Sequence, residues 1–586
     1  MFPRRHSLLV LCVLVCILFV FGCGSSNVPV ELSITPQTTF LFPGQTTSFK
    51  ATDSLGSDDI VWMASEIGGQ KQPFILPLSP GSFTAPDVTT NTNYLITICS
   101  KRNSSKLASA SLTVLANGYV AQTANPQVAD YLLKLPPGAS AYIEFGIDKN
   151  YQLKTWTQAA PTNGGELSFL VAGMLASTQY HMRAVVIASD GTQSFDADHT
   201  FTTQSIPAAE IPSVSVSTTP GRSPQPGIEV LNLIGTPSRS LVALDLSGNL
   251  IWSSPILAIT GAHLLPNDHF LICTAAVVEE VDLVGNIIQQ EQESSLNASL
   301  TAAGSNLQIE YFHHDAIALP NGHWIALAAT AQPCSGRDVC AANPIITGDV
   351  LIDLAPQPGG TFSPVWVWNS FDHLDVTRTP MSVADWTHSN AILYSPDDGN
   401  LMLSVRNQNW ILKIDYNHGQ GGGDLLWHLG YQGEFTLLGG TDPTDWFYAQ
   451  HRPSFATVNT AGKFSLIVMD NGDDRVFPVG VTCNAQGQPL CFYSASILLE
   501  IDESAKTANI AWKYLPGEYS FWGGDGQLLA NGDFEADFTA GSSETLSDIF
   551  EVTPGTAPEV VWHLRTNVEN AYRGFRLPSL YPGVQW

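Results

Sequence analysis

Charge is scarce in this chain, and positive charge is the scarcer kind. Only 13% of the 586 residues are charged, against about 25% in an average soluble domain. Lys and Arg number 25 and Asp and Glu number 53, which leaves a formal net charge of −28. Binding to a phosphate backbone depends on clustered basic residues. The composition therefore excludes general affinity for nucleic acid, and we expect no nucleic-acid partner.

Long apolar runs and helix-forming runs are also missing. The longest apolar run, residues 8–21, is shorter than the ~20 residues that span a bilayer. It follows Arg4 and Arg5, which gives it the form of a signal-peptide core. The chain has 48 Gly and 37 Pro, which indicate many turns, while its 27 Phe and 14 Trp provide for large cores. This composition argues against a mainly helical fold and favours an all-β one.

The apolar run ends in Phe-Gly-Cys23, and Gly-Ser-Ser follows. A small residue and then Cys directly after the apolar core resembles the lipobox of bacterial lipoproteins. The resemblance implies that residues 1–22 are a lipoprotein signal peptide, that Cys23 carries the lipid and that residues 23–27 form an anchor segment. We then expect an exported protein, periplasmic or at the cell surface, whose contact with the membrane is a lipid on Cys23. An ordinary secretory signal with an incidental Cys is the alternative.

Few cysteines remain beyond this segment. Cys334 and Cys340 close a short turn-rich loop, and so do Cys483 and Cys491. In an exported protein such close pairs predict local disulfides. Neither pair has the Cys-x-x-Cys spacing of a redox site. The two other cysteines lie in apolar, strand-like runs, and we expect them to be buried thiols.

Short alternating runs separated by turn residues predict two β-sandwich domains in the first half of the chain. Residues 28–116 resemble bacterial immunoglobulin-like modules. Residues 117–205 contain Gly173–Tyr180, which resembles the tyrosine corner of a fibronectin type III domain. Residues 206–225 are rich in Ser, Thr and Pro, and we expect them to be a linker.

An internal repeat fills residues 226–586. Six times, a strand-like run is followed by a turn and by an apolar run that usually ends in Trp. Between these copies lie hairpin signals built on Asn-Gly or Asp-Gly. Two hairpins per unit make four strands, which is one propeller blade, so the repeat predicts a six-bladed β-propeller. Seven or eight blades are the alternative. Five copies begin at an Asp that we interpret as a turn cap: Asp245, Asp282, Asp353, Asp415 and Asp502.

The repeat also predicts a site. His314, His388 and His451 precede the hairpin turns of three consecutive units. If the ring closes, the three imidazoles converge on one mouth of its channel, together with Asn390 and Arg406. A three-His metal site is one interpretation. The other is anion chemistry, in which Arg and amide donors hold an oxyanion and one His acts as the nucleophile. Because Arg406 would lie beside a dication, we favour the second interpretation and expect neither a metal nor a cofactor.

Six segments of this repeat resemble, in order, the motifs of bacterial arylsulfate sulfotransferases, the arylsulfotransferase family. They are Phe312–Asp315, Asp385–Asn390, Ser404–Asn409, Gln450–Pro453, Met469–Arg475 and Tyr572–Tyr581. The resemblance implies a six-bladed propeller that moves a sulfuryl group from an aryl sulfate ester to a phenol. It implies a ping-pong route that uses no nucleotide sulfate donor, with small molecules as partners.

Carried over, the resemblance makes His451 the nucleophile that becomes sulfated. Residues His314, His388, Asn390 and Arg406 would then hold the sulfuryl oxygens, and His388 or His314 would protonate the departing phenolate. Whether His313 or His314 matches the motif stays open. The rival from another class is a non-catalytic surface propeller that binds a glycan or a protein.

Overall fold

The structure, a computed structural model, describes most of the chain and is built almost entirely of strands. It describes residues 31–53, 60–68, 74–75, 81–100, 106–235, 239–258, 260–335, 340, 344–539 and 546–586. The expected signal peptide, anchor segment and lipidation site at Cys23 lie outside these residues. The chain forms two compact units: one of residues 1–123, 129–171 and 178–203, the other of residues 124–128, 172–177 and 204–586. Within the described residues, no helix is both long enough and apolar enough to span a membrane.

The first group of strands in the smaller unit surrounds one apolar core that contains the buried Trp62. Its main sheet has the order β2-β9-β8-β5-β6, in which only the β2–β9 pair is parallel. Two further pairs, β1–β4 and β3–β7, complete the group. The bounds are β1 Leu32–Thr35, β2 Thr38–Leu41, β3 Thr46–Ser48, β4 Lys50–Asp53, β5 Ile60–Glu66, β6 Phe74–Ile75, β7 Ser82–Thr84, β8 Thr92–Ser100 and β9 Leu107–Val114.

A second group of strands follows in the same unit. One sheet has the order β10-β11-β15, and the other is built around the β12–β16 pair. Alternate residues of β11 are buried, as expected for strands with one face on a core. The bounds are β10 Tyr119–Gln122, β11 Ala129–Leu135, β12 Ser140–Gly146, β13 Leu153–Lys154, β14 Gln158–Ala159, β15 Gly165–Val171, β16 Gln179–Ile187, β17 Gln193–Phe195 and β18 His199–Thr202. The division at residues 116 and 205 stays a prediction.

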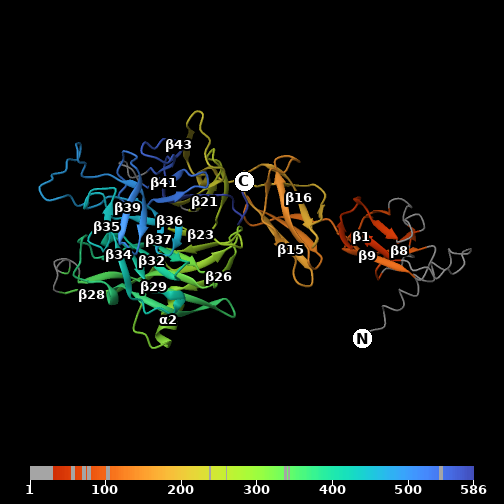
Figure 1. Cartoon of the computed structure of the whole chain (residues 1–586), viewed down its shortest axis with the longest axis horizontal. Helices are drawn as coiled ribbons and strands as arrows, with labels where there is room; N and C mark the ends of the chain where they lie inside the picture. Colours follow the sequence, from red (N-terminus) through yellow and green to blue (C-terminus); the bar gives the residue numbers. More distant parts are fainter. Residues whose placement is uncertain are drawn as a thin grey trace, which may run out of the picture. The chain divides into compact units, whose positions relative to one another are not determined.

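The larger unit contains six sheets, each with four antiparallel strands in succession. Figure 1 labels strands of this unit from β21 to β43. The first sheet holds β20 Ile228–Ile234, β21 Leu241–Leu244, β22 Leu250–Ser253 and β44 Asn570–Leu577; the second β23 Gly261–Leu264, β24 Phe270–Cys273, β25 Val277–Val281 and β26 Ile287–Gln292; the third β27 Tyr311–Ala318, β28 Trp324–Pro333, β29 Ile345–Gln357 and β30 Thr361–Asn369. The fourth holds β31 Ser389–Ser395, β32 Asn400–Val405, β33 Trp410–Ile414 and β34 Leu425–Leu429; the fifth β36 His451–Thr460, β37 Lys463–Asp470, β38 Ala495–Asp502 and β39 Thr507–Tyr514; the sixth β40 Asp525–Leu528, β41 Phe534–Phe538, β42 Asp548–Val552 and β43 Val560–Thr566.

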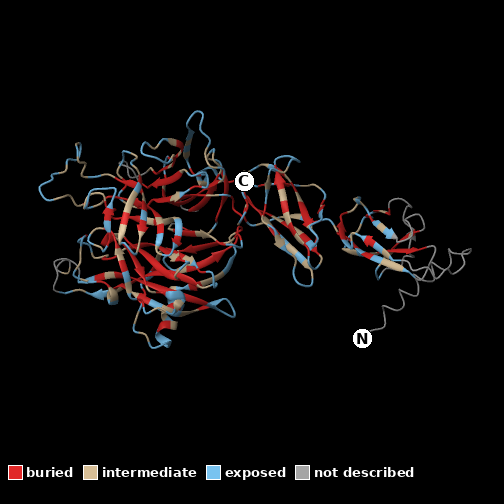
Figure 2. Ribbon diagram, in the orientation of Figure 1, coloured by how far each residue is buried: buried red, intermediate tan, exposed pale blue. Residues whose placement is uncertain are grey.

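These six sheets close into a ring. Shared apolar cores join the second sheet to the third, the third to the fourth, the fourth to the fifth, the fifth to the sixth and the sixth to the first. The first and second sheets meet where the rings of Trp252 and Phe270 stack at 5.1 Å. The last strand, β44, pairs with β20 and so completes the first sheet. The prediction of an all-β fold with a six-bladed propeller is confirmed, and most residues of its strands are buried (Figure 2).

The tryptophans of the repeat lie between neighbouring sheets. Trp252 donates its indole N–H to the Leu283 carbonyl at 2.8 Å, and Trp562 donates to the Leu246 carbonyl at 3.0 Å. Each bond satisfies a polar group that burial would otherwise leave without water. The Trp at the end of the repeated run is therefore a blade-to-blade contact.

The propeller carries additional elements at its edges. Strand β19, Val214–Thr218, lies within the segment expected to be a linker, yet it pairs with β43 as a fifth strand of the sixth sheet. Its alternating Val and Ser residues suit an outer strand with one covered face. Strand β35, Thr436–Leu438, runs parallel to β39. The helical segments are η2 Ala208–Glu210, α2 Glu293–Ala302, α4 Ser370–His373, η3 Arg406–Gln408 and η4 Asn417–Gly419.

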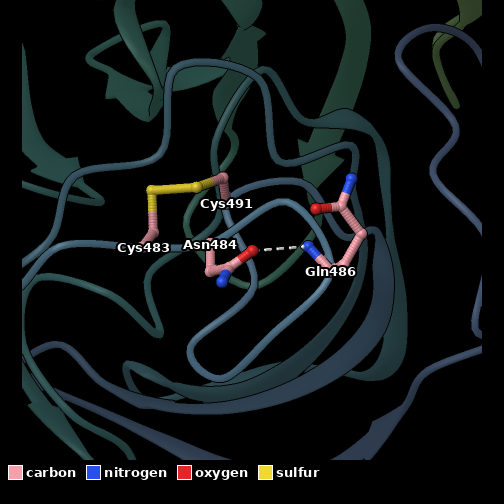
Figure 3. Close-up of a disulfide and its surroundings, with 4 residues drawn as sticks. All are labelled: Cys483, Asn484, Gln486 and Cys491. Carbon is pink, nitrogen blue, oxygen red and sulfur yellow. Dashed lines mark hydrogen bonds between the residues drawn. A yellow bond between two sulfur atoms is a disulfide. The ribbon is translucent and has the colours of Figure 1, made fainter.

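Both predicted disulfides are confirmed. Cys334 is bonded to Cys340, and Cys483 is bonded to Cys491 in the loop between β37 and β38. Figure 3 shows the second bond beside Asn484, whose side-chain oxygen accepts the Gln486 N–H at 2.9 Å. The remaining described cysteines, Cys99 and Cys273, are buried and belong to neither disulfide.

Candidate active site

Three neighbouring propeller strands are interrupted at equivalent points. The ladder between β27 and β28 is broken around His313–Asp315, the β31 ladder at Asn390 and the β36 ladder at Arg452–Pro453. A bulge of this kind bends a strand and re-aims its side chains. His314 and His388 also adopt the left-handed conformation, with φ of 56° and 48°. Such backbone is uncommon for residues other than glycine and clusters at functional sites.

The bulges bring the three predicted histidines together. The ring centroids of His314 and His388 are 4.8 Å apart. Tyr572, from the closing strand β44, lies close to both His314 and His451. The centroid of its ring is 5.9 Å from that of His314 and 6.0 Å from that of His451. Side chains from four sheets thus meet at one place in the ring.

His451 is held in one orientation by Asn471. The Asn471 amide donates to the Ser520 carbonyl at 2.8 Å and to the Gly523 carbonyl at 3.1 Å. Its oxygen must therefore face His451 Nδ1, 2.7 Å away, and accept a hydrogen bond from it. With the proton on Nδ1, the Nε2 lone pair is free to accept, and the Gly523 N–H donates to it at 3.3 Å.

Two of the histidines are neutral. Burial, reinforced by the charge of Arg406, lowers the pKa of His451 well below the usual histidine value. Burial also lowers the pKa of His314, and the nearby His313 and His388 act in the same direction. His451 therefore keeps its lone pair at pH values where an exposed histidine is protonated.

The other two imidazoles are paired with carboxylates. His388 Nδ1 lies 2.5 Å from Asp385 Oδ2, and His388 is more open to solvent than His451. His313 Nε2 lies 3.2 Å from Asp349 Oδ1, and its Nδ1 lies 2.7 Å from His314 Nδ1. The structure thus places His314 against the other rings of the site and His313 behind it.

Arg406 begins the 3-10 turn η3 and points its guanidinium at the loop before β40. It donates to Asp473 Oδ2 at 2.6 Å and to the Phe521 carbonyl at 3.0 Å. Asp473 also accepts a hydrogen bond from the Tyr519 hydroxyl. Burial raises the pKa of Asp473 to about 6, against the pull of Arg406. The cation of the site therefore faces a carboxylate that titrates close to neutral pH.

The Asn390 side chain is bonded to the backbone on both sides of His451. Its amide donates to the Gln450 carbonyl at 2.7 Å, and its oxygen accepts the Arg452 N–H at 3.4 Å. These two groups belong to the residues on either side of His451. The side chain is engaged with the backbone, so the geometry makes Asn390 a positioning residue for His451.

A buried ion-pair network lies beside the histidines. Asp315 accepts from His263 Nε2 at 2.7 Å, from Arg573 at 3.2 Å and from the Ile392 N–H at 3.0 Å. Burial opposes its charge, but Arg573 and His263 hold the pKa of Asp315 well below its usual range. This carboxylate joins strands β23, β27, β31 and β44 of four sheets and fixes the spacing of the residues around it.

The family model described as arylsulfotransferase (ASST) matches residues 218–573, which is more than half of the chain. The chain belongs to the arylsulfotransferase family. The matched segment ends at the closing strand, so it contains every residue of the candidate site.

Other comparisons add little about this arylsulfotransferase. No curated protein matches it. Among solved structures, it resembles a purple acid phosphatase from yellow lupin seeds at 12% identity, covering 32% of this chain and 43% of the phosphatase, with a TM-score of 0.16. It also resembles two fibronectin type III domains of chicken tenascin at 14% identity, covering 30% of this chain and 98% of that one, with a TM-score of 0.14. At these scores the fold rests on the strand pairing described above.

The arylsulfotransferase site includes a residue that sequence reasoning passed over. Tyr572 is 4% exposed, and its hydroxyl has no hydrogen-bond partner among the described residues. Burial raises the pKa of Tyr572 to about 12, so the phenol keeps its proton as a donor. A buried hydroxyl without a partner is costly, which indicates that a ligand supplies the missing acceptor. Its place in the tail motif Tyr572–Tyr581 was the available signal.

We predict opposite effects of Tyr572→Phe on stability and on activity. Removing an unpaired buried hydroxyl is expected to raise the free energy of unfolding by about 1 kcal/mol. Loss of a donor to a developing negative charge is expected to lower kcat by about tenfold or more. Chemical denaturation and steady-state kinetics on the same preparation measure both. A variant that is less stable and fully active would contradict the assignment of Tyr572 to the site.

The described part of this arylsulfotransferase contains no group of three His, Cys, Asp or Glu residues arranged to hold a metal ion. Each of the three imidazoles has one nitrogen within hydrogen-bonding distance of Asn471, Asp385 or His313.

Proposed function

We propose that the protein transfers a sulfuryl group from an aryl sulfate ester to a phenolic acceptor through a covalent intermediate on His451. The observation that carries this proposal is the state of His451, which is buried, neutral and held by Asn471 so that Nε2 keeps a lone pair. A fixed, unprotonated imidazole beside a guanidinium is suited to attack the sulfur of a bound sulfate ester.

In the first step, His451 Nε2 attacks the ester sulfur. An N–S bond forms, the S–O bond to the aryl group breaks, and the departing aryloxide takes a proton from His388. Arg406 and the Tyr572 hydroxyl stabilise the charge on the sulfuryl oxygens. The Gly523 N–H donates to Nε2 in the free protein. It loses that acceptor when the N–S bond forms and is then available to a sulfuryl oxygen.

In the second step, the acceptor phenol attacks the same sulfur. Its proton passes to the histidine that gave one up in the first step, the new S–O bond forms, and the N–S bond to His451 breaks. The enzyme returns to its starting state, so the donor needs no nucleotide group. His388 suits the proton transfers, because its Nδ1 lies 2.5 Å from Asp385 Oδ2, a contact that orients the ring toward the site.

The test uses the full chain with 4-nitrophenyl sulfate as donor and phenol as acceptor, in the absence of any nucleotide. We expect nitrophenol release, recovery of phenyl sulfate and parallel lines in a double-reciprocal analysis of the two substrates. Mass spectrometry after donor alone is expected to find one sulfuryl group on His451. If the protein releases no phenol from any of several aryl sulfates across a range of pH, the result would favour the non-catalytic binding propeller.

We predict that the donor KM rises as pH increases through about 6. Above that pH Asp473 is ionised and competes with the sulfate ester for Arg406; below it the carboxyl is neutral and Arg406 is released. Asp473→Asn is expected to flatten this rise and to lower the donor KM at neutral pH by about fivefold, as for a hydrogen bond to a charged group. The control is Asp474→Asn, which alters the neighbouring carboxyl. A rise in KM that persists in Asp473→Asn would contradict the prediction.

We further propose that the protein is exported and held at a membrane through a lipid on Cys23. The support is the sequence Phe-Gly-Cys23 after the apolar run. Metabolic labelling with a radioactive fatty acid is expected to mark the wild type and not Cys23→Ser. Equal labelling of both proteins would disprove the anchor.

A further inference from the structure

A chain of aromatic rings leads away from the candidate site. The ring of Tyr572 stacks with that of Trp522 at a centroid distance of 6.1 Å and an interplanar angle of 23°. Trp522 lies 6.4 Å from Phe521, which lies 6.4 Å from Tyr519, and Tyr519 lies 5.5 Å from Phe492. Each distance is within the range of direct aromatic contact. The series is therefore continuous from the ring beside His451 to the loop before β38.

The middle of this series is tied to the reactive groups. Residues 519–523 form the segment that precedes β40. Within it, the Phe521 carbonyl accepts from Arg406 at 3.0 Å and the Gly523 N–H donates to His451 Nε2 at 3.3 Å. The rings of Phe521 and Trp522 are thus presented from backbone that is already fixed against the cation and the nucleophile.

The outer end of the series is open to solvent. Phe521 is 38% exposed and Phe492 is 56% exposed, whereas Tyr572 at the inner end is buried. Phe492 directly follows the Cys483–Cys491 disulfide, which restricts the loop that carries it (Figure 3). Contiguous exposed apolar surface is typical of a ligand-binding surface.

We propose that Phe492, Tyr519, Phe521 and Trp522 form a subsite for phenols that carry a second aromatic ring. This inference rests on the proposed sulfuryl transfer and names the substrate class of the same site. A phenol with one ring, placed with its oxygen at His451, covers only the inner end of the series. A second ring, joined to the first, lies along Phe521 and Phe492 and replaces water on their exposed faces.

Binding without turnover tests the subsite directly. In the full-length His451→Ala protein, titration calorimetry compares phenyl sulfate with biphenyl-4-yl sulfate. We expect the biphenyl ester to bind more tightly, and we expect Phe492→Ala to reduce that difference by about fivefold, as for the loss of one aromatic contact. Tyr119→Ala, which removes an exposed ring from the smaller unit, is the matched control and is expected to leave the difference unchanged.

Turnover provides the second measurement. With 4-nitrophenyl sulfate as donor, Phe492→Ala is expected to lower the ratio of kcat/KM for 4-phenylphenol to that for phenol by the same factor. The subsite would be overturned if neither Phe492→Ala nor Phe521→Ala changed the kcat/KM ratio or the difference in affinity between the two sulfate esters. The calorimetric comparison requires no catalysis, so a failure of sulfuryl transfer and a failure of the subsite give different results.

Discussion

Replacing His451 with alanine is expected to reduce nitrophenol release from 4-nitrophenyl sulfate by about a thousandfold or more, as the removal of other catalytic nucleophiles does. The imidazole supplies the lone pair that attacks sulfur, and no neighbouring group replaces it in the same orientation, because Asn471 and Gly523 are arranged around this ring. Donor binding is expected to persist, since Arg406 and Tyr572 are unchanged. Steady-state kinetics and equilibrium binding of the donor separate the two effects.

The control for this prediction is His418→Ala, which removes an exposed imidazole that contacts Tyr394 outside the site. It is expected to retain full activity. Free imidazole added to His451→Gly is expected to restore part of the release, because it fills the space left by the side chain. Retention of more than a tenth of the wild-type rate in His451→Ala would rule out the covalent route in favour of direct transfer.

Replacing Arg576 with methionine is expected to lower the free energy of unfolding by about 3–5 kcal/mol, the usual cost of breaking a buried ion pair from one side. Arg576 on β44 contacts the carboxyl groups of Glu229 at 2.9 Å, Glu551 at 3.2 Å and Glu535 at 3.6 Å, and all three are buried. Without the guanidinium, these acids face one another in the interior. Chemical denaturation followed by tryptophan fluorescence reports on the propeller, because only Trp62 and Trp156 lie outside it.

The matched control is Glu535→Gln. Burial and the neighbouring Glu229 raise the pKa of Glu535 well above its usual value, so the folded state favours the protonated carboxyl. The folded state then binds a proton that the unfolded state loses above its ordinary pKa, and stability falls as pH rises past that value. Glu535→Gln is expected to be about as stable as the wild type, within about 1 kcal/mol, and to reduce this fall. A loss as large as that of Arg576→Met would contradict a protonated Glu535.

The sequence was informative wherever a pattern repeats or a spacing is short. Trp252 and Trp562 at the ends of repeated runs predicted the sheets that they join, and close Cys spacing predicted both disulfides. Register within the repeat also predicted that His314, His388 and His451 converge. Each of these depends on local periodicity, which survives in a single sequence.

The remaining features depend on contacts between distant segments. Asn471 lies in the Met469–Arg475 motif, and only the fold shows that it orients His451. Asn390 was predicted to contact the sulfuryl group, whereas its amide is bonded to the backbone on both sides of the nucleophile. Asp353 does not cap a turn as its repeat position suggests, but accepts from the Tyr416 hydroxyl at 2.6 Å. Periodicity in a sequence predicts which strand a residue belongs to, and it does not show what lies across the ring.

The pairing of β44 with β20 sets the order in which the molecule is completed during synthesis. Tyr572 and Arg573 leave the ribosome after all of the other described strands, so the growing chain holds five complete sheets and an unfinished first one until then. Contacts between such distant segments form slowly. A nascent chain arrested before residue 570 would carry all three histidines but would lack the Tyr572 phenol and the Arg573 guanidinium. Such a chain would be inactive although nearly full length.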